Sequence, residues 1–238
     1  MHVMSVDHLI EPPRAFIEAL GFGADLAASG YLVTYGVTPN RPETGYGYIK
    51  VGSKIVSYRN NTAYKVISFK EKPPLTRARQ YVAKRHYLWN AGIFTLRISI
   101  ILKEMERLAP KVLAAVEKYT ASGRPEHFAR SPDISIDYAV MEKSRRLAIV
   151  RGHFRWDDVG SWLALERFFP TDRNGSIRLG NVQGLEMYDS IIYTSGIPVR
   201  AYGIRDLIIV ARPDGILVCN KSKAPLIKNI LKNKRRIR

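Results

Sequence analysis

Cysteine is nearly absent from this chain: Cys219 is the single one among 238 residues, which excludes an intramolecular disulfide. Long apolar runs are missing too, and no stretch approaches the roughly 18 residues that cross a bilayer. The N-terminal residues lack the basic region and apolar core of a secretion signal. These absences exclude a disulfide scaffold and a membrane-spanning chain, and we expect a cytoplasmic protein.

Acidic residues are scarce. The chain has 21 Asp and Glu against 38 Lys and Arg, which gives a formal net charge of +17. The last 18 positions contain eight basic residues and no acid: Lys221, Lys223, Lys228, Lys232, Lys234, Arg235, Arg236 and Arg238. This tail has no aromatic residue to stack on a base, which disfavours nucleic acid as a partner. A basic helix end, stabilised by the helix dipole, is the simpler interpretation. The remaining positive charge suits phosphorylated substrates.

The order of expected elements indicates an α/β domain followed by a β-rich one. Up to Pro170, short apolar strands alternate with amphipathic helices. The strands are expected at 2–6, 31–36, 49–51, 64–69, 93–96 and 147–150, and the helices at 13–20, 76–84, 99–108, 110–119, 136–143 and 161–169. Beyond that point, turn sequences separate apolar runs at 190–194, 207–211 and 216–219, before a helix near 224–232. We therefore expect a helix-covered α/β sheet over residues 1–170 and a small β-rich domain over residues 171–238.

Five short segments contain polar residues that a generic α/β core does not need. Asp7 follows an apolar strand, where open α/β sheets place ligand-binding groups. Residues 42–49, PETGYGYI, contain two glycines that let the backbone approach a ligand. The other three segments are FKEKP at 69–73, WNAGIF at 89–94 and WDDVGSW at 156–162. Each segment alone has a structural interpretation as a helix cap, a turn, a bulge or a surface ion pair, so the evidence lies in their combination.

In this order the five segments resemble the mannose-1-phosphate guanylyltransferases, within the wider nucleoside-diphosphate-sugar pyrophosphorylases. PETGYGYI is the most discriminating piece, and SIDYAVMEK at 135–143 and GIRDLIIV at 203–210 also match. The resemblance runs from Val6 to about Asn220. It implies a Rossmann-like nucleotidyltransferase sheet and the transfer of GMP from GTP to mannose-1-phosphate, which yields GDP-mannose and pyrophosphate.

The resemblance also implies roles for individual residues. Asp7 and Asp158 would bind one Mg²⁺, an ion that prefers hard oxygen ligands. Lys72 would face the sugar phosphate and complete the catalytic set. The substrate-binding set would be Glu43, Thr44, Gly45, Gly47, Glu71, Asn90 and Asp137. No protein nucleophile is required, because positioning and charge neutralisation carry phosphoryl transfer.

One signature of the resembled family has no counterpart in residues 1–238. It is a nucleotide-binding Gly-rich loop, followed by an Arg and later a Lys; Gly21 and Gly23 lack that continuation. We therefore expect an N-terminally truncated catalytic domain, or one completed by an N-terminal segment from another polypeptide, and impaired activity in the chain alone. A non-catalytic sugar-phosphate-binding or regulatory subunit is the main alternative. The sequence leaves open whether the chain forms a homo-oligomer.

Overall fold

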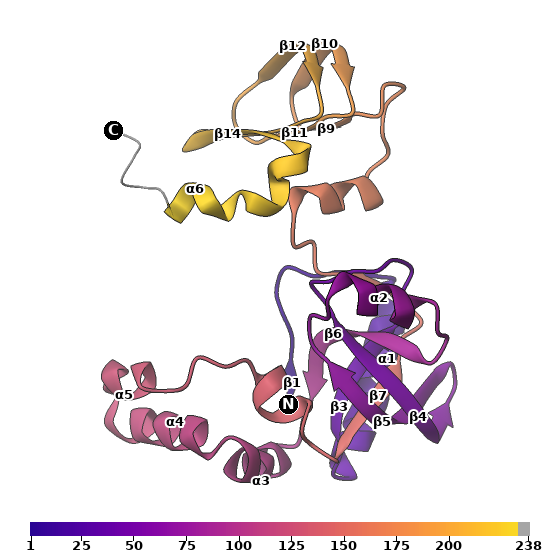
Figure 1. Ribbon diagram of the computed structural model, residues 1–238, viewed down its shortest axis with the longest axis vertical. Helices are drawn as coiled ribbons and strands as arrows, with labels where there is room; N and C mark the ends of the chain where they lie inside the picture. The colour runs from indigo at the N-terminus through magenta and orange to yellow at the C-terminus, as the bar shows by residue number, and fades with distance from the viewer. Residues whose placement is uncertain (233–238) are drawn as a thin grey trace. The chain divides into compact units, whose positions relative to one another are not determined.

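The computed structural model describes residues 1–232 and contains two compact units, Met1–Asp158 and a second that begins at Val159 (Figure 1). The division comes before the change of composition at Pro170, because the 3₁₀ helix η2 (Trp162–Arg167) packs on the core of the second unit. Lys234, Arg235, Arg236 and Arg238 of the basic tail lie outside the described residues. Within the part that the structure describes, no helix has the length and apolar character of a membrane span.

The first unit is built on a mixed six-stranded sheet with the strand order β1-β6-β3-β7-β5-β4. Its strands are β1 (His2–Val3), β3 (Leu32–Val37), β4 (Gly47–Tyr58), β5 (Asn61–Lys70), β6 (Tyr87–Thr95) and β7 (Leu147–Arg151). β3 and β7 run parallel, whereas the other pairings in this sheet are antiparallel. The α/β class expected from the sequence is confirmed.

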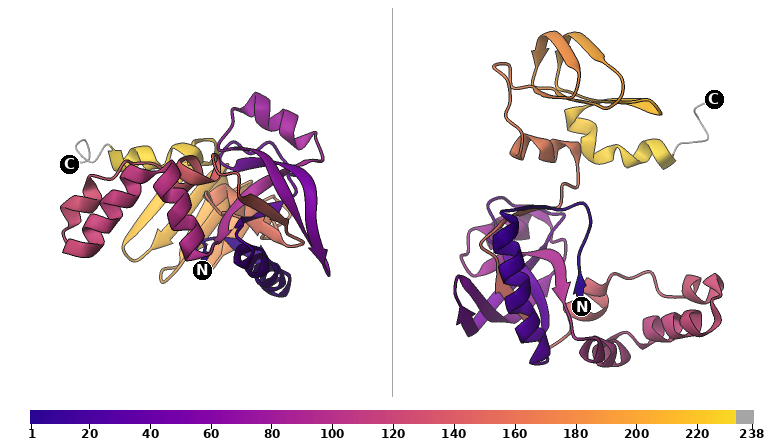
Figure 2. Two further views of the ribbon diagram at one scale, coloured as in Figure 1. Left: turned by 90° about the horizontal axis from the view of Figure 1, so that it is seen from below. Right: turned by 180° about the vertical axis from the view of Figure 1, so that it is seen from behind.

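Alternation along the central strands gives the sheet two apolar faces. On β3, Val33 and Tyr35 pack into the cluster that includes α1 (Pro13–Ala28). Leu32 and Ile149 point to the other face, toward α3 (Ile98–Leu108) and the π-helical turn η1 (Asp137–Met141). Because successive side chains of a strand point to opposite faces, both layers follow from the period-2 pattern. Figure 2 shows α1 lying along one face of the sheet.

Helix α1 continues beyond residue 20, where the sequence predicts its end. Gly21 and Gly23 do not break it, and Gly23 has a packing reason to be glycine. A Cβ at Gly23 would lie 2.1 Å from the hydroxyl of Tyr35 on β3. The missing side chain therefore lets the helix approach the sheet closely, which offsets the low helix propensity of glycine.

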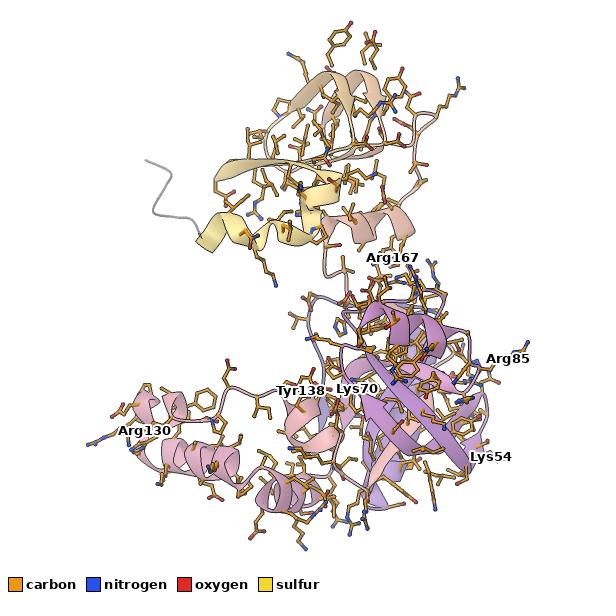
Figure 3. All side chains as sticks on the ribbon, in the orientation of Figure 1. Lys54, Lys70, Arg85, Arg130, Tyr138 and Arg167 are labelled. Carbon is orange, nitrogen blue, oxygen red and sulfur yellow. The ribbon has the colours of Figure 1, made fainter. Side chains whose placement is uncertain are left out.

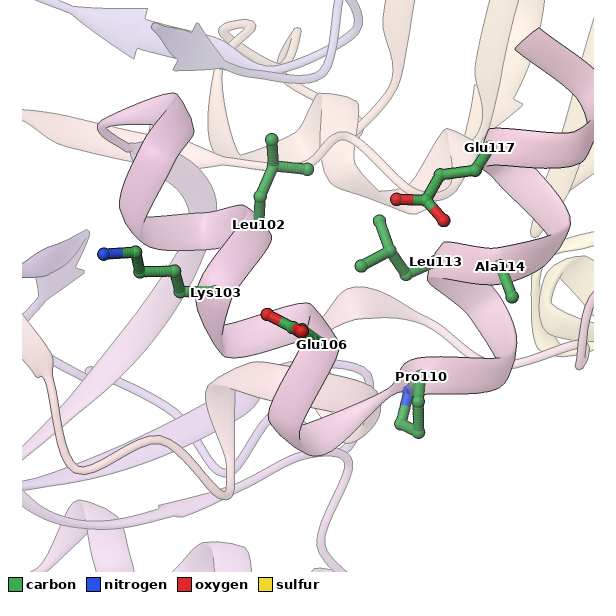
Figure 4. A pocket seen from close by; sticks show the side chains of 7 residues that line it. All are labelled: Leu102, Lys103, Glu106, Pro110, Leu113, Ala114 and Glu117. Atoms are coloured by element: carbon green, nitrogen blue, oxygen red, sulfur yellow. The ribbon is translucent and has the colours of Figure 1, made fainter. Parts of the chain in front are cut away.

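The other helices of this unit are α2 (Leu75–Val82), α4 (Pro110–Ser122) and α5 (Pro125–Ala129). α3 and α4 enclose a shallow hollow, shown in Figure 4, whose lining residues are Leu102, Lys103, Glu106, Pro110, Leu113, Ala114 and Glu117. The hollow contains none of the residues that the sequence selects for chemistry.

The second unit is a stack of short strands. Two parallel groups form it, β9 (Ile177–Leu179) with β11 (Ile191–Thr194) and β13 (Leu207–Arg212), and β10 (Val182–Tyr188) with β12 (Val199–Arg205). Three buried isoleucines, Ile177, Ile191 and Ile208, are aligned across the first group. β14 (Gly215–Asn220), the 3₁₀ helix η3 (Lys221–Leu226) and α6 (Lys228–Lys232) complete the described part. The β-rich character of this region is confirmed.

Candidate active site

A short antiparallel pairing joins the chain segments next to Asp7 and Asp158. β2 (Leu9–Glu11) pairs with β8 (Arg155–Asp157), and Leu9 lies opposite Asp157. Asp158 directly follows β8, and Asp7 lies two residues before β2. Asp7 is exposed and Asp158 is half-buried. The pairing therefore brings the chain segments that contain Asp7 and Asp158 together, although the two residues are far apart in the sequence.

The sequence-based position of Asp7 at a strand end is wrong. β1 ends at Val3, and Asp7 lies in a bend between β1 and β2. The chain leaves the six-stranded sheet because residues 9–11 pair with β8 in a separate two-stranded sheet. Asp7 thus reaches the site through the β2–β8 pairing rather than through the main sheet.

Asp158 is held by a network that begins at Arg41. The Tyr46 hydroxyl donates to Asp158 Oδ1 over 2.8 Å, and Arg41 donates to the same hydroxyl over 3.1 Å. Arg41 also pairs with the buried Asp157 over 3.2 Å. Burial, and then the neighbouring Asp158 carboxylate, raise the pKa of Tyr46 above its ordinary value. The hydroxyl therefore keeps its proton and acts as a donor to Asp158.

Aromatic rings surround this network. The Arg41 guanidinium lies 4.9 Å from the ring centroid of Trp89, a cation–π distance. Trp156 packs edge-on against Tyr46, with ring centroids 4.9 Å apart, and its Nε1 donates to His8 Nδ1 over 3.1 Å. The rings fix the orientation of Tyr46 on one side and of His8, the neighbour of Asp7, on the other.

A second group of polar side chains gathers around Gly47. In the β4–β6 pairing Gly47 lies opposite Asn90. A Cβ at Gly47 would lie 2.4 Å from Glu71 Oε2 and 3.2 Å from Asn90 Cβ. Only glycine therefore lets the backbone of PETGYGYI approach the Glu71 and Asn90 side chains this closely.

A chain of hydrogen bonds orients Asn90. The hydroxyl of buried Thr34 donates to Asn90 Oδ1 over 2.6 Å, and Asn90 Nδ2 donates to Asp137 Oδ1 over 3.1 Å. With its oxygen engaged by Thr34, the amide turns its NH₂ group toward Asp137. Asp137 belongs to η1, and a π-helical turn frequently marks a functional position.

Glu71 is a buried acid with an unused acceptor. Its Oε2 is buried without a hydrogen-bond partner among the described residues. Burial raises its pKa from 4.5 to about 7, helped by the negative charges of Asp137 and Glu142 and opposed by Lys72. Burial likewise raises the pKa of Asp137. Burying a carboxylate oxygen without a hydrogen-bond partner destabilises the folded protein. Such an atom is expected where a hydroxyl group of a ligand supplies the missing partner.

The remaining predicted residues lie around these two groups. Lys72 Nζ is 3.8 Å from Glu71 Oε1, and the Lys72 side chain is largely exposed. Glu43 accepts the backbone N–H of Gly45 over 3.1 Å, which closes the turn before Gly47, and Thr44 is exposed within that turn.

Two residues with left-handed backbone directly follow proposed site residues. Lys72, after Glu71, has φ +46°, and Val159, after Asp158, also has φ +46°. This conformation is uncommon for a side-chain-bearing residue and an outlier for β-branched valine. Such strain concentrates at binding and catalytic positions, where the surrounding structure maintains it.

Several residues of this arrangement are absent from the set selected by sequence. They are Thr34, Arg41, Tyr46, Trp89, Tyr138, Glu142 and Trp156. Tyr138 donates to the Glu71 carbonyl oxygen over 3.5 Å, and Glu142 Oε1 accepts the Glu71 N–H over 2.9 Å. Figure 3 labels Tyr138 and Lys70, the neighbour of Glu71, at this end of the sheet. Five of these seven residues lie inside the segments quoted in the sequence analysis. The segments therefore predicted which parts of the chain form the site, but not which side chains contact one another.

The donor set fits a magnesium ion better than a transition metal. The described residues contain no group of three or more His, Cys, Asp or Glu side chains that could hold a metal. A cation at Asp7 and Asp158 would therefore take two carboxylates from the protein. Mg²⁺ is ordinarily bound by one or two carboxylates together with substrate phosphates and water.

Comparison with protein families gives two matches. The nucleotidyl transferase family model matches residues 1–175, and the MannoseP isomerase/GMP-like beta-helix domain model matches residues 180–233. The second match agrees with the parallel strand stacking after Val159.

Curated relatives and a solved structure agree with these matches. Mannose-1-phosphate guanylyltransferase RfbM of Salmonella typhimurium is 35% identical over 238 residues, covering 96% of this chain and 49% of that protein. Mannose-1-phosphate guanylyltransferase of Escherichia coli is 33% identical over 240 residues, covering 97% and 50%. The crystal structure named mannose-1-phosphate geranyltransferase, from Thermus thermophilus, superposes with a TM-score of 0.84 at 34% identity, covering 98% of this chain and 69% of that one. The chain spans about half the length of the two curated relatives.

Proposed function

This chain belongs to the nucleotidyl transferase family, and we propose that it provides the sugar-phosphate side of a guanylyltransferase that makes GDP-mannose. The substrates are GTP and mannose-1-phosphate, and the products are GDP-mannose and pyrophosphate. The names of the Salmonella and Escherichia coli relatives support this choice of substrates. The observation that carries the proposal is the convergence of Glu71, Asn90 and Asp137 beside Gly47, with Glu71 Oε2 buried and unsatisfied.

Glu71 and Asn90 bind hydroxyl groups of the mannose ring in this proposal. Glu71 Oε2 offers an acceptor at neutral pH, or a donor when protonated, and Asn90 contributes its amide. The backbone at Gly45 and Gly47 lies against the sugar, since a side chain at Gly47 would collide with Glu71. A site built to hydrogen-bond specific hydroxyls discriminates strongly against a sugar that lacks them.

Lys72, Asp7 and Asp158 act on the phosphate groups. The exposed Lys72 ammonium attracts the sugar phosphate as a point charge. Asp7 and Asp158 hold Mg²⁺, which when bound neutralises charge on the phosphate oxygens.

The chemistry is a displacement at phosphorus. An oxygen of the mannose-1-phosphate phosphate attacks the α-phosphorus of GTP, forming a new P–O bond. The bond from the α-phosphorus to the α,β-bridging oxygen breaks, and pyrophosphate leaves with the bonding electrons. The residues of this chain contribute orientation and charge, which are the main sources of catalysis in phosphoryl transfer.

Product formation tests this function. GDP-mannose and pyrophosphate are measured from GTP and mannose-1-phosphate, first with this chain alone and then with the chain joined to an N-terminal segment that carries the Gly-rich loop of the resembled family. We expect equal amounts of both products from the joined protein, and a rate lower by about five powers of ten without the loop that positions the triphosphate. Asp158→Asn in the joined protein should lower the rate roughly a hundredfold or more. The matched control is Asp25→Asn, at an exposed position of α1.

The same assay separates the alternatives. Turnover by the chain alone at the rate of the joined protein would reveal a nucleotide site within residues 1–238. If a folded, joined protein binds mannose-1-phosphate but makes no product, a non-catalytic sugar-phosphate-binding subunit is favoured. If it neither binds nor turns over, the proposed function is wrong.

A further inference from the structure

Tyr46 connects the two polar groups of the site. It lies between Gly45 and Gly47 and is 5% exposed. Its hydroxyl donates to Asp158 Oδ1 over 2.8 Å, and its carbonyl oxygen accepts the backbone N–H of Lys72 over 3.2 Å. One residue therefore contacts both the proposed metal-binding carboxylate and the proposed sugar-phosphate segment.

The alternation of strand side chains explains how one residue reaches both groups. Successive residues of an extended chain point to opposite faces of a sheet. The open side of Gly47 meets Glu71 and Asn90. The ring of Tyr46 packs instead into the cluster of the α1 face, beside Trp89 and Trp156. Tyr46 therefore links the Gly45–Gly47 turn to a hydroxyl group on the opposite face of the sheet.

The position and direction of the hydroxyl are both fixed. Trp89 and Trp156 pack edge-on against the Tyr46 ring, with ring centroids 5.2 Å and 4.9 Å away. Arg41 donates to the hydroxyl oxygen over 3.1 Å, and a guanidinium can only donate. With its oxygen accepting from Arg41, the hydroxyl directs its own proton to Asp158. The Tyr46 hydroxyl therefore acts only as a donor toward Asp158, and this hydrogen bond orients the carboxylate.

We propose that Tyr46 is a positioning residue that ties the orientation of Asp158 to the sugar-phosphate turn. The inference rests on the proposed function, because it takes Asp158 as a cation ligand and Gly45–Gly47 as part of the sugar site. Sugar phosphate that orders the turn also orders Asp158, so sugar-phosphate binding and cation binding strengthen one another through Tyr46. Such coupling is reciprocal: each ligand raises the affinity for the other by the same factor.

Manganese binding to the full chain tests this role. Mn²⁺ serves as a paramagnetic substitute for Mg²⁺, and its free fraction is measured by electron paramagnetic resonance with and without mannose-1-phosphate. The variants are Tyr46→Phe, Asp158→Asn and the double variant. Tyr35→Phe is the matched control, since the buried Tyr35 hydroxyl bonds to Thr95 outside the site over 2.6 Å. Thermal unfolding of each variant establishes that it is folded at the assay temperature.

We expect Tyr46→Phe to bind Mn²⁺ about tenfold more weakly, as for the loss of a hydrogen bond to a charged group. The gain in Mn²⁺ affinity on adding mannose-1-phosphate should fall in the same variant. Asp158→Asn should lose Mn²⁺ binding, and Tyr46→Phe should cause no further loss in that background, because it acts through Asp158. Tyr35→Phe should bind like the parent.

The outcomes distinguish a failure of the proposed role of Tyr46 from a failure of the proposed function. If Asp158→Asn loses Mn²⁺ while folded Tyr46→Phe binds it like the parent, the role of Tyr46 is overturned and the proposed function stands. If Asp158→Asn binds like the parent, the metal assignment fails, and the inference fails with it. Should Tyr46→Phe not fold, Asp158→Glu replaces it, because it keeps the charge but moves the carboxylate relative to the Tyr46 hydroxyl. Parent-like Mn²⁺ affinity and coupling in Asp158→Glu would overturn the inference.

Discussion

The hydroxyl of Thr34 donates to Asn90 Oδ1 over 2.6 Å, between two neighbouring strands of the main sheet. Thr34 is fully buried, and Asn90 is 6% exposed. With its oxygen engaged by Thr34, the Asn90 amide presents its nitrogen to Asp137 Oδ1 over 3.1 Å. Thr34 is therefore a positioning residue for a side chain that we propose contacts the sugar.

Thr34→Val should destabilise the protein by about 1–3 kcal/mol, because it leaves the buried Asn90 oxygen without its donor. The variant has nearly the shape of threonine, so packing changes little. Thr34→Ser is the matched control: it keeps the hydroxyl and loses one methyl group, at a cost of roughly 1 kcal/mol. Urea unfolding measures both. Equal stability of Thr34→Val and the parent protein would show that the bond contributes nothing.

Gly47→Ala should weaken mannose-1-phosphate binding at least tenfold. The new Cβ would lie 2.4 Å from Glu71 Oε2 and 2.6 Å from Phe69 Cε2, so the Glu71 side chain must move. Overpacking of this kind also costs about 1–3 kcal/mol of stability. Gly21→Ala is the matched control, since a Cβ there meets nothing within 4 Å and its position is helical. Calorimetric titration of both variants checks the result, and undiminished binding by Gly47→Ala would contradict it.

Glu71 should make stability depend on pH near neutrality. Its pKa rises from 4.5 in an ordinary environment to about 7 in the fold, so the folded state holds the proton more tightly than the unfolded chain does. The stabilisation from Glu71 is then full below about pH 4.5 and is lost as pH rises through about 7.

Glu71→Gln removes this titration and should flatten the stability profile across that range. Glu117→Gln, at an exposed position of α4, is the control and should keep the profile of the parent protein. The urea concentration at the midpoint of unfolding, measured in steps between about pH 5 and 8, compares the three stability profiles. Parallel profiles for the parent protein and Glu71→Gln would refute a raised pKa at this position.

The sequence predicted local structure where periodicity was strong. The apolar run at 147–150 and the helical spacing of 99–108 each gave an element within about two residues of its observed bounds, as expected for segments with strong local signals. Elements with weak local signals were missed or misplaced. β8 spans only three residues, and it is stabilised by pairing with β2, which lies near the start of the unit's sequence. No local pattern contains that information.

The residues of the site were also predicted in part, whereas the contacts between them were not. Glu71, Asn90 and Asp137 were selected because their segments resemble those of the guanylyltransferases, and the structure brings the three residues together. The contacts of Tyr46 with Asp158 and of Thr34 with Asn90 were not predicted, because each joins residues far apart in the chain. Tyrosine between two glycines indicates a turn, but the direction of its hydroxyl depends on the packing of Trp89 and Trp156.

Calorimetric titration of the chain with mannose-1-phosphate tests the proposed site most directly. With Mg²⁺ present, we predict measurable binding that weakens when Mg²⁺ is removed and is lost in Glu71→Ala, while Glu117→Ala binds like the parent protein. Loss in Glu71→Ala alone would assign the sugar contact to the group beside Gly47. No binding by the folded parent chain, or equal binding by the parent protein and Glu71→Ala, would contradict the assignment of a sugar-phosphate site to these residues.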